Sequence, residues 1–291
     1  MKGSRAQLAT EPLHTVGLMG WPVEHSVSPA MHNAAFEALH LPWHYSLLPV
    51  PPGEVRSVLA QIRELGWRGI NVTVPHKQAV MPYLDSLTAA GRAIGAVNTI
   101  SVQDGCLIGH NTDGDGFLAA LKEVGFAPSR RAVLVLGAGG GARSVVYALA
   151  LAGCAVTLHN RTEERAARLV RDLQGTISWP GGGWLKQATR LEDLELSGYD
   201  LLVNTTPLGM WPNVDASPWP EELAIPSHWT VYDLVYNPAE TRLLSRARSA
   251  GATPVGGLGM LVHQGALAFE LWTGQAPPVE VMVAAAKEAL A

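Results

Sequence analysis

Two charged side chains of opposite sign stand at turns that follow expected strands. Lys77 comes two residues after Pro75 in NVTVPHK, and Asp113 lies in HNTDGDG. A lysine beside a buried carboxylate can relay the proton of an alcohol while a hydride leaves the alcohol carbon. We therefore expect Lys77 and Asp113 to form an acid/base pair. The alternative is that Lys77 is an ordinary surface residue, as an exposed lysine after a proline usually is.

Neutral polar side chains are expected at the same strand ends. In GINVTVP, Asn71 and Thr73 share one strand face, and the apolar residues Ile70, Val72 and Val74 share the other. Further polar residues at strand ends are Asn98, Asn111 and Thr112. Amides and hydroxyls both donate and accept, which is what the hydroxyls of a polyhydroxylated ring require. The alternative is a polar strand face that is merely solvated.

The stretch HSVSPAMHN brings two hydroxyls to the expected start of a helix. Ser26 and Ser28 share a face of an extended segment, and Pro29 suits the first helical position, so Ser28 is predicted as the N-cap. Two hydroxyls beside a helix N-terminus form a cluster of donors that suits a carboxylate. Taken alone, the same pattern is also explained by a capping serine and a solvated one.

A glycine-rich loop follows an apolar strand in VLVLGAGGGA. Gly137, Gly139 and Ala142 fit G-x-G-x-x-G/A, which provides a tight turn, close backbone approach to a pyrophosphate and close packing of helix on strand. The following helix N-terminus offers free N–H groups to an anion. This context predicts a dinucleotide site and not merely a flexible turn.

The next strand ends in Asn160 and is followed by Arg161, Thr162 and Arg165. An NAD site would place a carboxylate at this position to hold the ribose diol. The two arginines instead suit a 2′-phosphate, so NADP is the predicted cofactor. The alternative is that Thr162 caps the helix and both arginines are solvated.

Strand and helix signals alternate along the whole chain. The fold class predicted is α/β with two domains: a Rossmann-type dinucleotide-binding domain and a substrate domain, with a cleft between them. The boundaries expected are 1–114 for the substrate domain, completed by helices within 258–291, and 115–257 for the Rossmann-type domain. QDG predicts a hairpin turn, residues 76–94 a pair of helices, and the Trp/Pro-rich segment 211–229 a surface loop.

Composition excludes several classes of function. The 21 Lys and Arg nearly balance the 25 Asp and Glu of 291 residues, which is not the charge of a nucleic-acid-binding face. No apolar run is long enough to span a membrane, and the N-terminus has no apolar signal segment, so a cytoplasmic protein is expected.

With no HExxH and no Cys/His cluster, no metal is expected. Two distant cysteines make a disulfide improbable. A small-molecule substrate is the expected partner.

With these segments in view, the sequence resembles the shikimate dehydrogenase family along nearly its whole length. The matching pieces are HSVSPAMHN, NVTVPHK, AVNT, NTDGDG, GAGGGA, NRTEER, VNTTPLGM, DLVYNP and GLGMLVHQGALAF. The resemblance implies an NADPH-dependent, reversible reduction of 3-dehydroshikimate to shikimate in aromatic amino-acid biosynthesis. A monomer or a homodimer is expected.

The resemblance also implies a role for each matching position. Lys77 is the implied catalytic acid/base and Asp113 its partner. The implied substrate-binding residues are Ser26, Ser28 and Tyr236 for the carboxylate and Asn71, Thr73, Asn98 and Gln264 for the ring hydroxyls. The implied cofactor-binding residues are Gly137, Ala138, Gly139, Gly140, Gly141, Ala142, Asn160, Arg161, Thr162, Arg165, Thr205, Thr206, Leu208, Gly257 and Met260.

Two other functions stay open from the sequence. One is a quinate/shikimate dehydrogenase that also uses NAD, although such relatives often carry Thr at the second serine and an acidic residue near the ribose, where this chain has Ser28 and Asn160. The other is a non-catalytic dinucleotide-sensing protein, against which the intact Lys77 and Asp113 argue. The segment 211–229 is longer than the resemblance leads us to expect.

Overall fold

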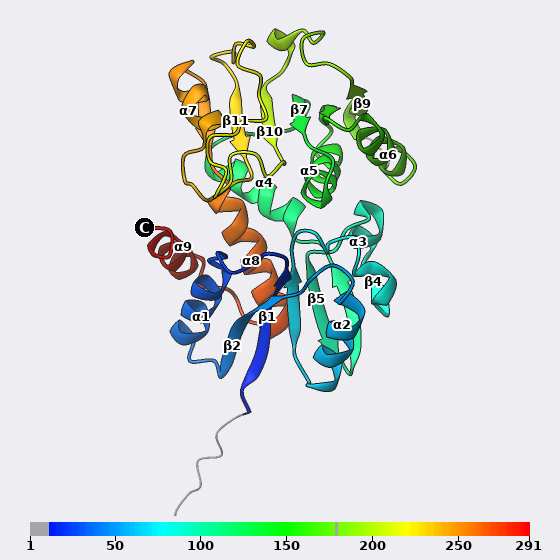
Figure 1. Ribbon diagram of the computed structural model, residues 1–291, viewed down its shortest axis with the longest axis vertical. Helices are drawn as coiled ribbons and strands as arrows, with labels where there is room; N and C mark the ends of the chain where they lie inside the picture. Colours follow the sequence, from blue (N-terminus) through cyan, green and yellow to red (C-terminus); the bar gives the residue numbers. More distant parts are fainter. Residues whose placement is uncertain (1–11, 178–179) are drawn as a thin grey trace, which may run out of the picture.

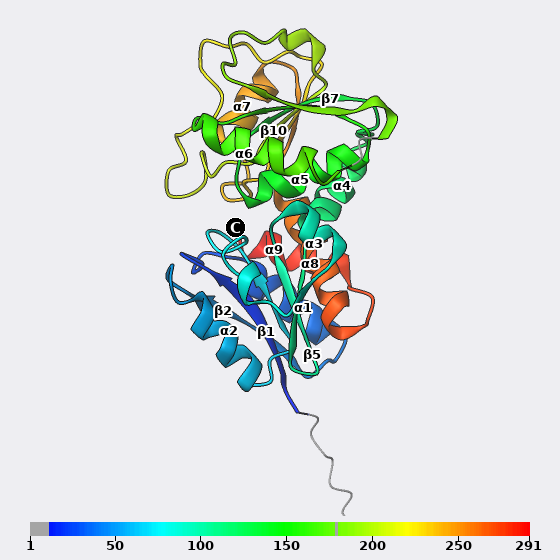
Figure 2. The same cartoon turned by 90° about the vertical axis from the view of Figure 1, so that its right-hand side faces the viewer.

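The computed structural model describes residues 12–177 and 180–291, which form two lobes, each built on a sheet of six strands (Figure 1). Residues 1–11 lie outside the described residues. Helices α4 (Asp113–Glu123) and α8 (Leu258–Thr273) pack against each other where the lobes meet, as both side views show (Figures 1 and 2). The predicted two-sheet α/β architecture is confirmed, while the boundaries at 114 and 257 stay predictions.

The first sheet has the strand order β2-β1-β3-β5-β6-β4. Its strands are β1 (His14–Gly20), β2 (Trp43–Pro49), β3 (Gly69–Val72), β4 (Ser86–Leu87), β5 (Thr99–Gln103) and β6 (Cys106–His110). β5 runs antiparallel to both β3 and β6, and the other pairs are parallel. The predicted hairpin turn joins β5 to β6, with positive φ at Asp104 (50°) and Gly105 (77°).

The helices of the first lobe come from both ends of the chain. They are α1 (Ser28–Ala38), α2 (Val55–Glu64), α3 (Ala89–Ile94), α8 and α9 (Val279–Glu288). Phe269 and Trp272 of α8 share a core with Val16 of β1 and Phe36 of α1, and the Trp272 indole N–H donates to Ile100 O at 3.0 Å. The C-terminal helices therefore pack on the core of the first lobe.

The second sheet is entirely parallel, in the order β12-β11-β10-β7-β8-β9. Its strands are β7 (Ala132–Leu136), β8 (Ala155–His159), β9 (Trp184–Ala188), β10 (Leu201–Asn204), β11 (Thr230–Asp233) and β12 (Thr253–Val255). Counted from β7, this is the order 3-2-1-4-5-6 of a Rossmann fold, in which ligands bind beyond the strand ends where the order reverses, between β7 and β10. The helices are α5 (Gly140–Leu151), α6 (Glu163–Gln174) and α7 (Arg242–Ser249).

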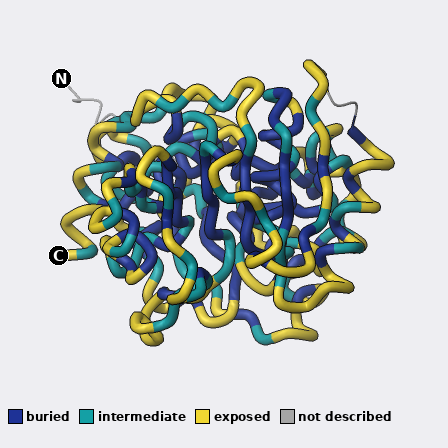
Figure 3. Tube along the Cα trace, turned by 90° about the horizontal axis from the view of Figure 1, so that it is seen from above, coloured by how far each residue is buried: buried dark blue, intermediate teal, exposed yellow. Residues whose placement is uncertain are grey.

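The cores of both lobes follow the strands. Seen from above, the buried stretches of the chain occupy the middle of the molecule and the exposed stretches its rim (Figure 3). In the second lobe, Val133, Val135 and Leu158 of the sheet pack with Leu149 of α5 and Leu169 of α6. Both sheets are therefore rigid supports for the loops at their strand ends.

The segment 76–94 does not contain the predicted pair of helices. It forms a 3-10 turn (Met81–Tyr83), the short strand β4 and one helix, α3. Pro82 has no N–H to continue a helix. The hydroxyl of Thr88 accepts the N–H of Gly91 at 3.2 Å and caps α3, so the only α-helix of this segment begins there.

The segment 211–229 is irregular, as predicted, but it is not merely a surface loop. Trp219 and Trp229 are 1% and 0% exposed, and their rings meet edge to face at 5.5 Å between centroids. Their indole N–H groups donate to Leu223 O and Leu196 O, respectively. The prediction was wrong for these residues because buried aromatic anchors in an irregular segment follow no periodicity.

In the part of the chain that the structure describes, no helix is both long and apolar enough to cross a bilayer. Neither Cys106, which is exposed, nor Cys154, which is buried, is in a disulfide.

Candidate active site

The predicted acid/base pair is close in space. Lys77 Nζ lies 2.6 Å from Asp113 Oδ2, and Asp113 is 4% exposed. Asp113 is the first residue of α4, where the helix dipole favours a negative charge. Its other oxygen, Oδ1, accepts a hydrogen bond from Asn98 Nδ2 at 2.9 Å. The Lys77 side chain is 17% exposed, so the ion pair lies at the edge of the site.

The glycine loop of the second sheet reaches this pair. A Cβ atom at position 140 would lie 3.1 Å from the Cβ of Lys77. Gly140 is the first residue of α5, which follows β7 at the point where the strand order of the Rossmann-type sheet reverses. The acid/base pair of one lobe and the glycine loop of the other are thus in contact.

Asn98 connects the pair to the C-terminal part of the chain. Its Nδ2 also lies 2.8 Å from Thr112 Oγ1 and 3.2 Å from Gln264 Oε1, and its Oδ1 accepts the N–H of Thr112 at 2.7 Å. Gln264 belongs to α8 and donates to Leu261 O. The structure therefore brings together Asn98, Asp113 and Gln264, as the sequence predicts for one site.

Asn71 is held by a tyrosine that sequence reasoning missed. The hydroxyl of Tyr45 donates to Asn71 Oδ1 at 2.8 Å, and Asn71 Nδ2 donates to Thr99 Oγ1 at 3.0 Å. Burial raises the pKa of Tyr45 well above its ordinary value, against an opposing hydrogen bond to Ser28. Tyr45 lies in β2, an edge strand of the first sheet. No motif lies near it in the sequence, so nothing there indicated a role in the site.

The polar face of the β3 segment is shorter than predicted. Thr73, half-buried, lies just beyond the end of β3, and its N–H still donates to Met19 O at 2.9 Å. Val74 is 69% exposed, whereas Ile70 and Val72, which the sequence places on the same strand face, are buried. The alternation ends because β3 stops at Val72, one residue before the segment turns.

The two serines of HSVSPAMHN form the cluster predicted for them. Ser26 Oγ donates to Ser28 Oγ at 3.1 Å. The prediction of Ser28 as N-cap was wrong: Val27 is at that position, Ser28 is the first residue of α1, and the helix has no side-chain capping bond. The Ser28 hydroxyl is engaged by its neighbours instead of by the helix backbone.

Tyr236 reaches the serine cluster from the second lobe. Burial raises the pKa of Tyr236, and a hydrogen bond with Ser26 acts in the opposite direction. Tyr236 follows β11 by three residues, so this contact joins the strand ends of both sheets. Hydroxyls from Ser26, Ser28 and Tyr236 are therefore available together for a carboxylate.

The glycine loop has the conformation that its sequence predicts. Gly137 has φ of +106°, and a Cβ there would lie 2.5 Å from Thr205 Oγ1. A Cβ at Gly139 would meet nothing within 4 Å, so the backbone is open to a ligand at this point. Ala142 is fully buried, as close packing of helix on strand requires.

The start of α5 supplies the donors that a pyrophosphate needs. Gly137 N is already used, because it donates to His159 O at 2.8 Å. Ala138 and Gly139 lead from there into Gly140 and Gly141, the first two residues of the helix. N–H groups in a first helical turn have no partner within the helix, so they are available to bind an anion.

The arginines predicted for the 2′-phosphate are exposed at the end of β8. Within residues 12–177 and 180–291, neither Arg161 nor Arg165 is in an ion pair. Asn160 Nδ2 donates to Thr162 O at 2.8 Å. Thr162 stands at the N-cap of α6 but makes no side-chain capping bond, so the capping alternative is not supported.

Three of the other predicted cofactor residues follow β10. The Thr205 hydroxyl donates to Leu136 O at 2.6 Å beside the glycine loop, and Thr206 bonds to Asn204 through both N and Oγ1. Leu208 is 39% exposed. These residues lie on the other side of the strand-order reversal from the glycine loop.

Gly257 and Met260 stand at the start of α8. A Cβ at Gly257 would lie 2.1 Å from Leu234 O, so only glycine fits this close approach. Met260 is 7% exposed, and its side chain packs in the core of the second lobe. Its predicted position near the nicotinamide stays a prediction.

Sequence reasoning also missed Asp233, although it belongs to the motif DLVYNP. This carboxylate is fully buried at the end of β11, and burial raises its pKa to about 6, against hydrogen bonds from Thr241, Val235 and Asn204. A buried acid with neutral partners leaves no signal in charge patterns along the chain.

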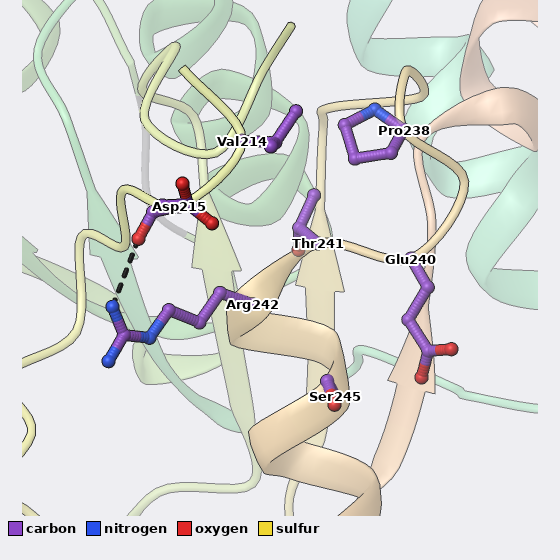
Figure 4. A pocket seen from close by; sticks show the side chains of 7 residues that line it. All are labelled: Val214, Asp215, Pro238, Glu240, Thr241, Arg242 and Ser245. Carbon is purple, nitrogen blue, oxygen red and sulfur yellow. Dashed lines mark hydrogen bonds between the residues drawn. The ribbon is translucent and has the colours of Figure 1, made fainter. Parts of the chain in front are cut away.

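A hollow of about 480 Å³ lies elsewhere, beside α7 (Figure 4). It is lined by Val214, Asp215, Pro238, Glu240, Thr241, Arg242 and Ser245. The Arg242 guanidinium is already bound to Asp215 O and Glu221, and none of the residues predicted for catalysis lines this hollow. Among the described residues, no group of His, Cys, Asp or Glu has the arrangement of a metal site.

A Rossmann-type sheet with its glycine loop, placed against a second α/β lobe that carries the Lys77–Asp113 ion pair, defines a two-domain oxidoreductase of the dinucleotide-dependent class. Residues 18–100 match the shikimate dehydrogenase substrate binding domain, 119–194 the shikimate/quinate 5-dehydrogenase family and 257–287 the shikimate 5′-dehydrogenase C-terminal domain. The chain belongs to the shikimate dehydrogenase family.

Individual relatives match over nearly the full length. The chain is 50% identical to the shikimate dehydrogenase (NADP(+)) of Moorella thermoacetica, over 94% of this chain and 93% of the relative. It is 46% identical to that of Symbiobacterium thermophilum, over 98% of each. The crystal structure of shikimate 5-dehydrogenase from Thermus thermophilus, in complex with NADP(H) and shikimate, superposes with a TM-score of 0.84 at 41% identity, over 95% of this chain and 100% of the other.

Proposed function

We propose that the protein is an NADP-dependent shikimate dehydrogenase, which catalyses the reversible reduction of 3-dehydroshikimate to shikimate in aromatic amino-acid biosynthesis. The observation that carries this proposal is the 2.6 Å contact of Lys77 Nζ with Asp113 Oδ2 beside the glycine loop. Family membership supports the choice of substrate, and the full-length relatives named above carry the same activity in their names.

Lys77 is proposed as the acid/base. In the direction of reduction, the Lys77 ammonium donates a proton to the oxygen of the substrate carbonyl as that oxygen becomes a hydroxyl. In the reverse direction the Lys77 amine accepts that proton. Asp113 is proposed to hold the Nζ group in place, because the carboxylate is fixed by Asn98 and by the start of α4.

The cofactor NADP supplies or accepts the hydride when it is bound. The open backbone at Gly139 and the N–H groups at the start of α5 fit its pyrophosphate, and the exposed guanidinium groups of Arg161 and Arg165 fit its 2′-phosphate. The residues proposed to hold its other parts are Asn160, Thr162, Thr205, Thr206, Leu208, Gly257 and Met260.

The substrate is proposed to lie between the two lobes. Ser26, Ser28 and Tyr236 would bind its carboxylate through hydroxyl donors. Its ring hydroxyls would be bound by Asn71, Thr73, Asn98 and Gln264. Asn71, Asn98 and Gln264 are 4%, 2% and 9% exposed and already oriented by hydrogen bonds, so little reorganisation is needed on binding.

We further propose that the enzyme is cytoplasmic and acts as a monomer or a homodimer. Gel filtration with light scattering would distinguish these two states.

A spectrophotometric assay tests the proposed function. The purified protein is mixed with shikimate and NADP⁺, and the absorbance of NADPH is followed; quinate and NAD⁺ are tested in the same way. Rapid reduction with shikimate and NADP⁺, and much slower reduction with the other combinations, is the expected result. Comparable rates with quinate and NAD⁺ would identify the broader quinate/shikimate enzyme, and no reduction with any pair would overturn the proposal.

A further inference from the structure

The buried carboxylate of Asp233 is bound only by neutral donors in the described part of the chain. Thr241 Oγ1 donates to Oδ2 at 2.7 Å, and Asn204 Nδ2 and Val235 N donate to Oδ1 at 2.8 and 3.0 Å. These donors come from three segments: the start of α7, the end of β10 and the chain just after β11. A buried charge that is held in this way fixes the positions of all its donors.

The carboxylate fixes the orientation of the Asn204 amide. An ionised carboxylate only accepts hydrogen bonds, so the Nδ2 group must face Asp233 and Oδ1 must face away. On that side, Asn204 Oδ1 accepts from Thr206 N at 2.9 Å and from Thr206 Oγ1 at 2.7 Å. Thr206 Oγ1 in turn accepts from Leu208 N at 3.3 Å. These bonds connect the cofactor loop at 205–208, through Asn204, to the buried acid.

The same carboxylate holds the segment that faces this loop. Besides the Val235 N–H bond to Asp233, Gly257 N donates to Val235 O at 3.1 Å, and Leu234 N donates to Asn204 O at 3.0 Å. The next residue, Tyr236, reaches Ser26 in the other lobe. Two walls of the site, residues 204–208 and 234–236, are thus tied to one fully buried side chain.

We propose that Asp233 is a positioning residue, whose carboxylate aligns the 204–208 loop and the 234–236 segment for cofactor binding. The identity of the cofactor as NADP rests on the proposed function. The alignment itself does not, because its hydrogen bonds exist in the protein without any ligand.

Two substitutions at one position separate alignment from charge. Asp233→Ala removes every acceptor. Asp233→Asn keeps Oδ1 for Asn204 and Val235 and turns its Nδ2 toward Thr241 Oγ1, which can accept as well as donate. The conservative variant should therefore rescue the alignment.

The readouts are amide hydrogen exchange of Thr206 and Val235 in the ligand-free protein, and the Kd of NADP⁺ by calorimetry. Asp233→Ala is expected to speed both amides by about tenfold or more and to raise the Kd by about tenfold, with kcat changed by less than about threefold. Asp233→Asn is expected to stay within about twofold of the unmodified protein in each measurement. Asp200→Asn, a partly exposed carboxylate just before β10, is the matched control.

Unchanged exchange and unchanged Kd in Asp233→Ala, or equal defects in the Ala and Asn variants, would overturn the proposal. If Asp233→Ala does not fold, Asn204→Ala breaks the same chain of hydrogen bonds between Asp233 and Thr206, at a side chain with no proposed contact to the cofactor, and must speed exchange at position 206 and weaken NADP⁺ binding. Exchange is measured without ligand, so its outcome is independent of whether shikimate is the substrate.

Discussion

Gly140 of the Rossmann-type lobe lies against Lys77 of the substrate lobe, so closely that a Cβ at position 140 would be 3.1 Å from the Cβ of Lys77. This contact is shorter than ordinary van der Waals distance, so a methyl group would have to displace the lysine stem or the start of α5. The cofactor loop and the acid/base pair are therefore positioned by each other.

Gly140→Ala should lower kcat by roughly tenfold, because even a small displacement of a catalytic group is costly. Gly141→Ala is the matched comparison, since a Cβ there would be 3.4 Å from Leu234, an ordinary contact. Both variants are expected to weaken NADP binding, and only the first to lower kcat at saturating substrates. Steady-state kinetics measure both effects, and equal kcat values for the two variants would contradict the argument.

Lys77→Ala should reduce turnover by about two to four powers of ten, the range for lost acid/base help, while the KM of shikimate changes much less. Lys77→Met keeps most of the side-chain volume beside Gly140 and should lose as much. Stopped-flow and steady-state rates of NADPH formation provide the measurement. Near-normal turnover in either variant would remove Lys77 from the catalytic role.

Much of the site follows from patterns that are local in sequence. The glycine loop is set by an apolar strand, a positive φ at Gly137 and a small residue at Ala142, all within one short stretch. Lys77 and Asp113 follow β3 and β6 of one sheet, so the sequence placed both at strand ends, but its spacing alone did not fix the distance between them.

What the sequence did not predict depends on packing between distant segments. The roles of Tyr45 and Asp233 are visible only from contacts in the folded protein: the Tyr45 hydroxyl reaches Asn71, and the Thr241 hydroxyl at the start of α7 reaches Asp233. Ser28 was placed one position off because Pro29 was taken as the first helical residue, whereas the helix begins at Ser28 and Val27 is its N-cap. The buried Trp219 and Trp229 have no periodic neighbours that would reveal a core.

Arg161→Ala should weaken NADP binding far more than NAD binding, because the guanidinium is exposed, is in no ion pair among the described residues and is proposed to bind the 2′-phosphate, which NAD lacks. A loss of roughly tenfold or more in NADP affinity is expected for one charge-assisted contact. Arg168→Ala, an exposed arginine further along α6, controls for the general loss of positive charge. Calorimetry with each cofactor decides the matter: equal losses for NADP and NAD would defeat the assignment.

Asp233→Asn should alter the pH dependence of stability. Burial raises the pKa of Asp233 in the folded protein from 3.8 to about 6. The contribution of this group to stability is therefore fully present below pH 3.8 and is lost as the pH rises through 6. At pH 8 the ionised carboxylate is therefore a cost, with an upper bound on the order of 3 kcal/mol. Urea unfolding should find the Asn variant at least as stable as the unmodified protein at pH 8, with its relative advantage declining toward pH 4. A constant difference across that range would be the contrary result.

The buried His32 changes the stability of the protein with pH in the opposite direction. Its ring is stacked on Tyr45 at 4.3 Å between centroids, neither ring nitrogen has a hydrogen-bond partner among the described residues, and burial lowers its pKa from 6.5 to about 3. Between these two pH values the unfolded chain binds a proton that the folded protein does not, so stability falls as the pH drops from 6.5 toward 3. The loss is on the order of 1.4 kcal/mol per pH unit, or about 2 kcal/mol at pH 5.

His32→Phe keeps a planar ring beside Tyr45 and removes the titrating group. The variant should match the unmodified protein within about 1 kcal/mol at pH 8 and exceed it at pH 5, because its unfolded state no longer gains a proton at position 32. Denaturant unfolding at both pH values measures this, with His44→Gln, an exposed histidine of β2, as the control. If the ring acts only by packing on Tyr45, kcat and the KM of shikimate stay within about twofold. An identical acid slope in His32→Phe and the unmodified protein would show that His32 is not what destabilises the fold at low pH.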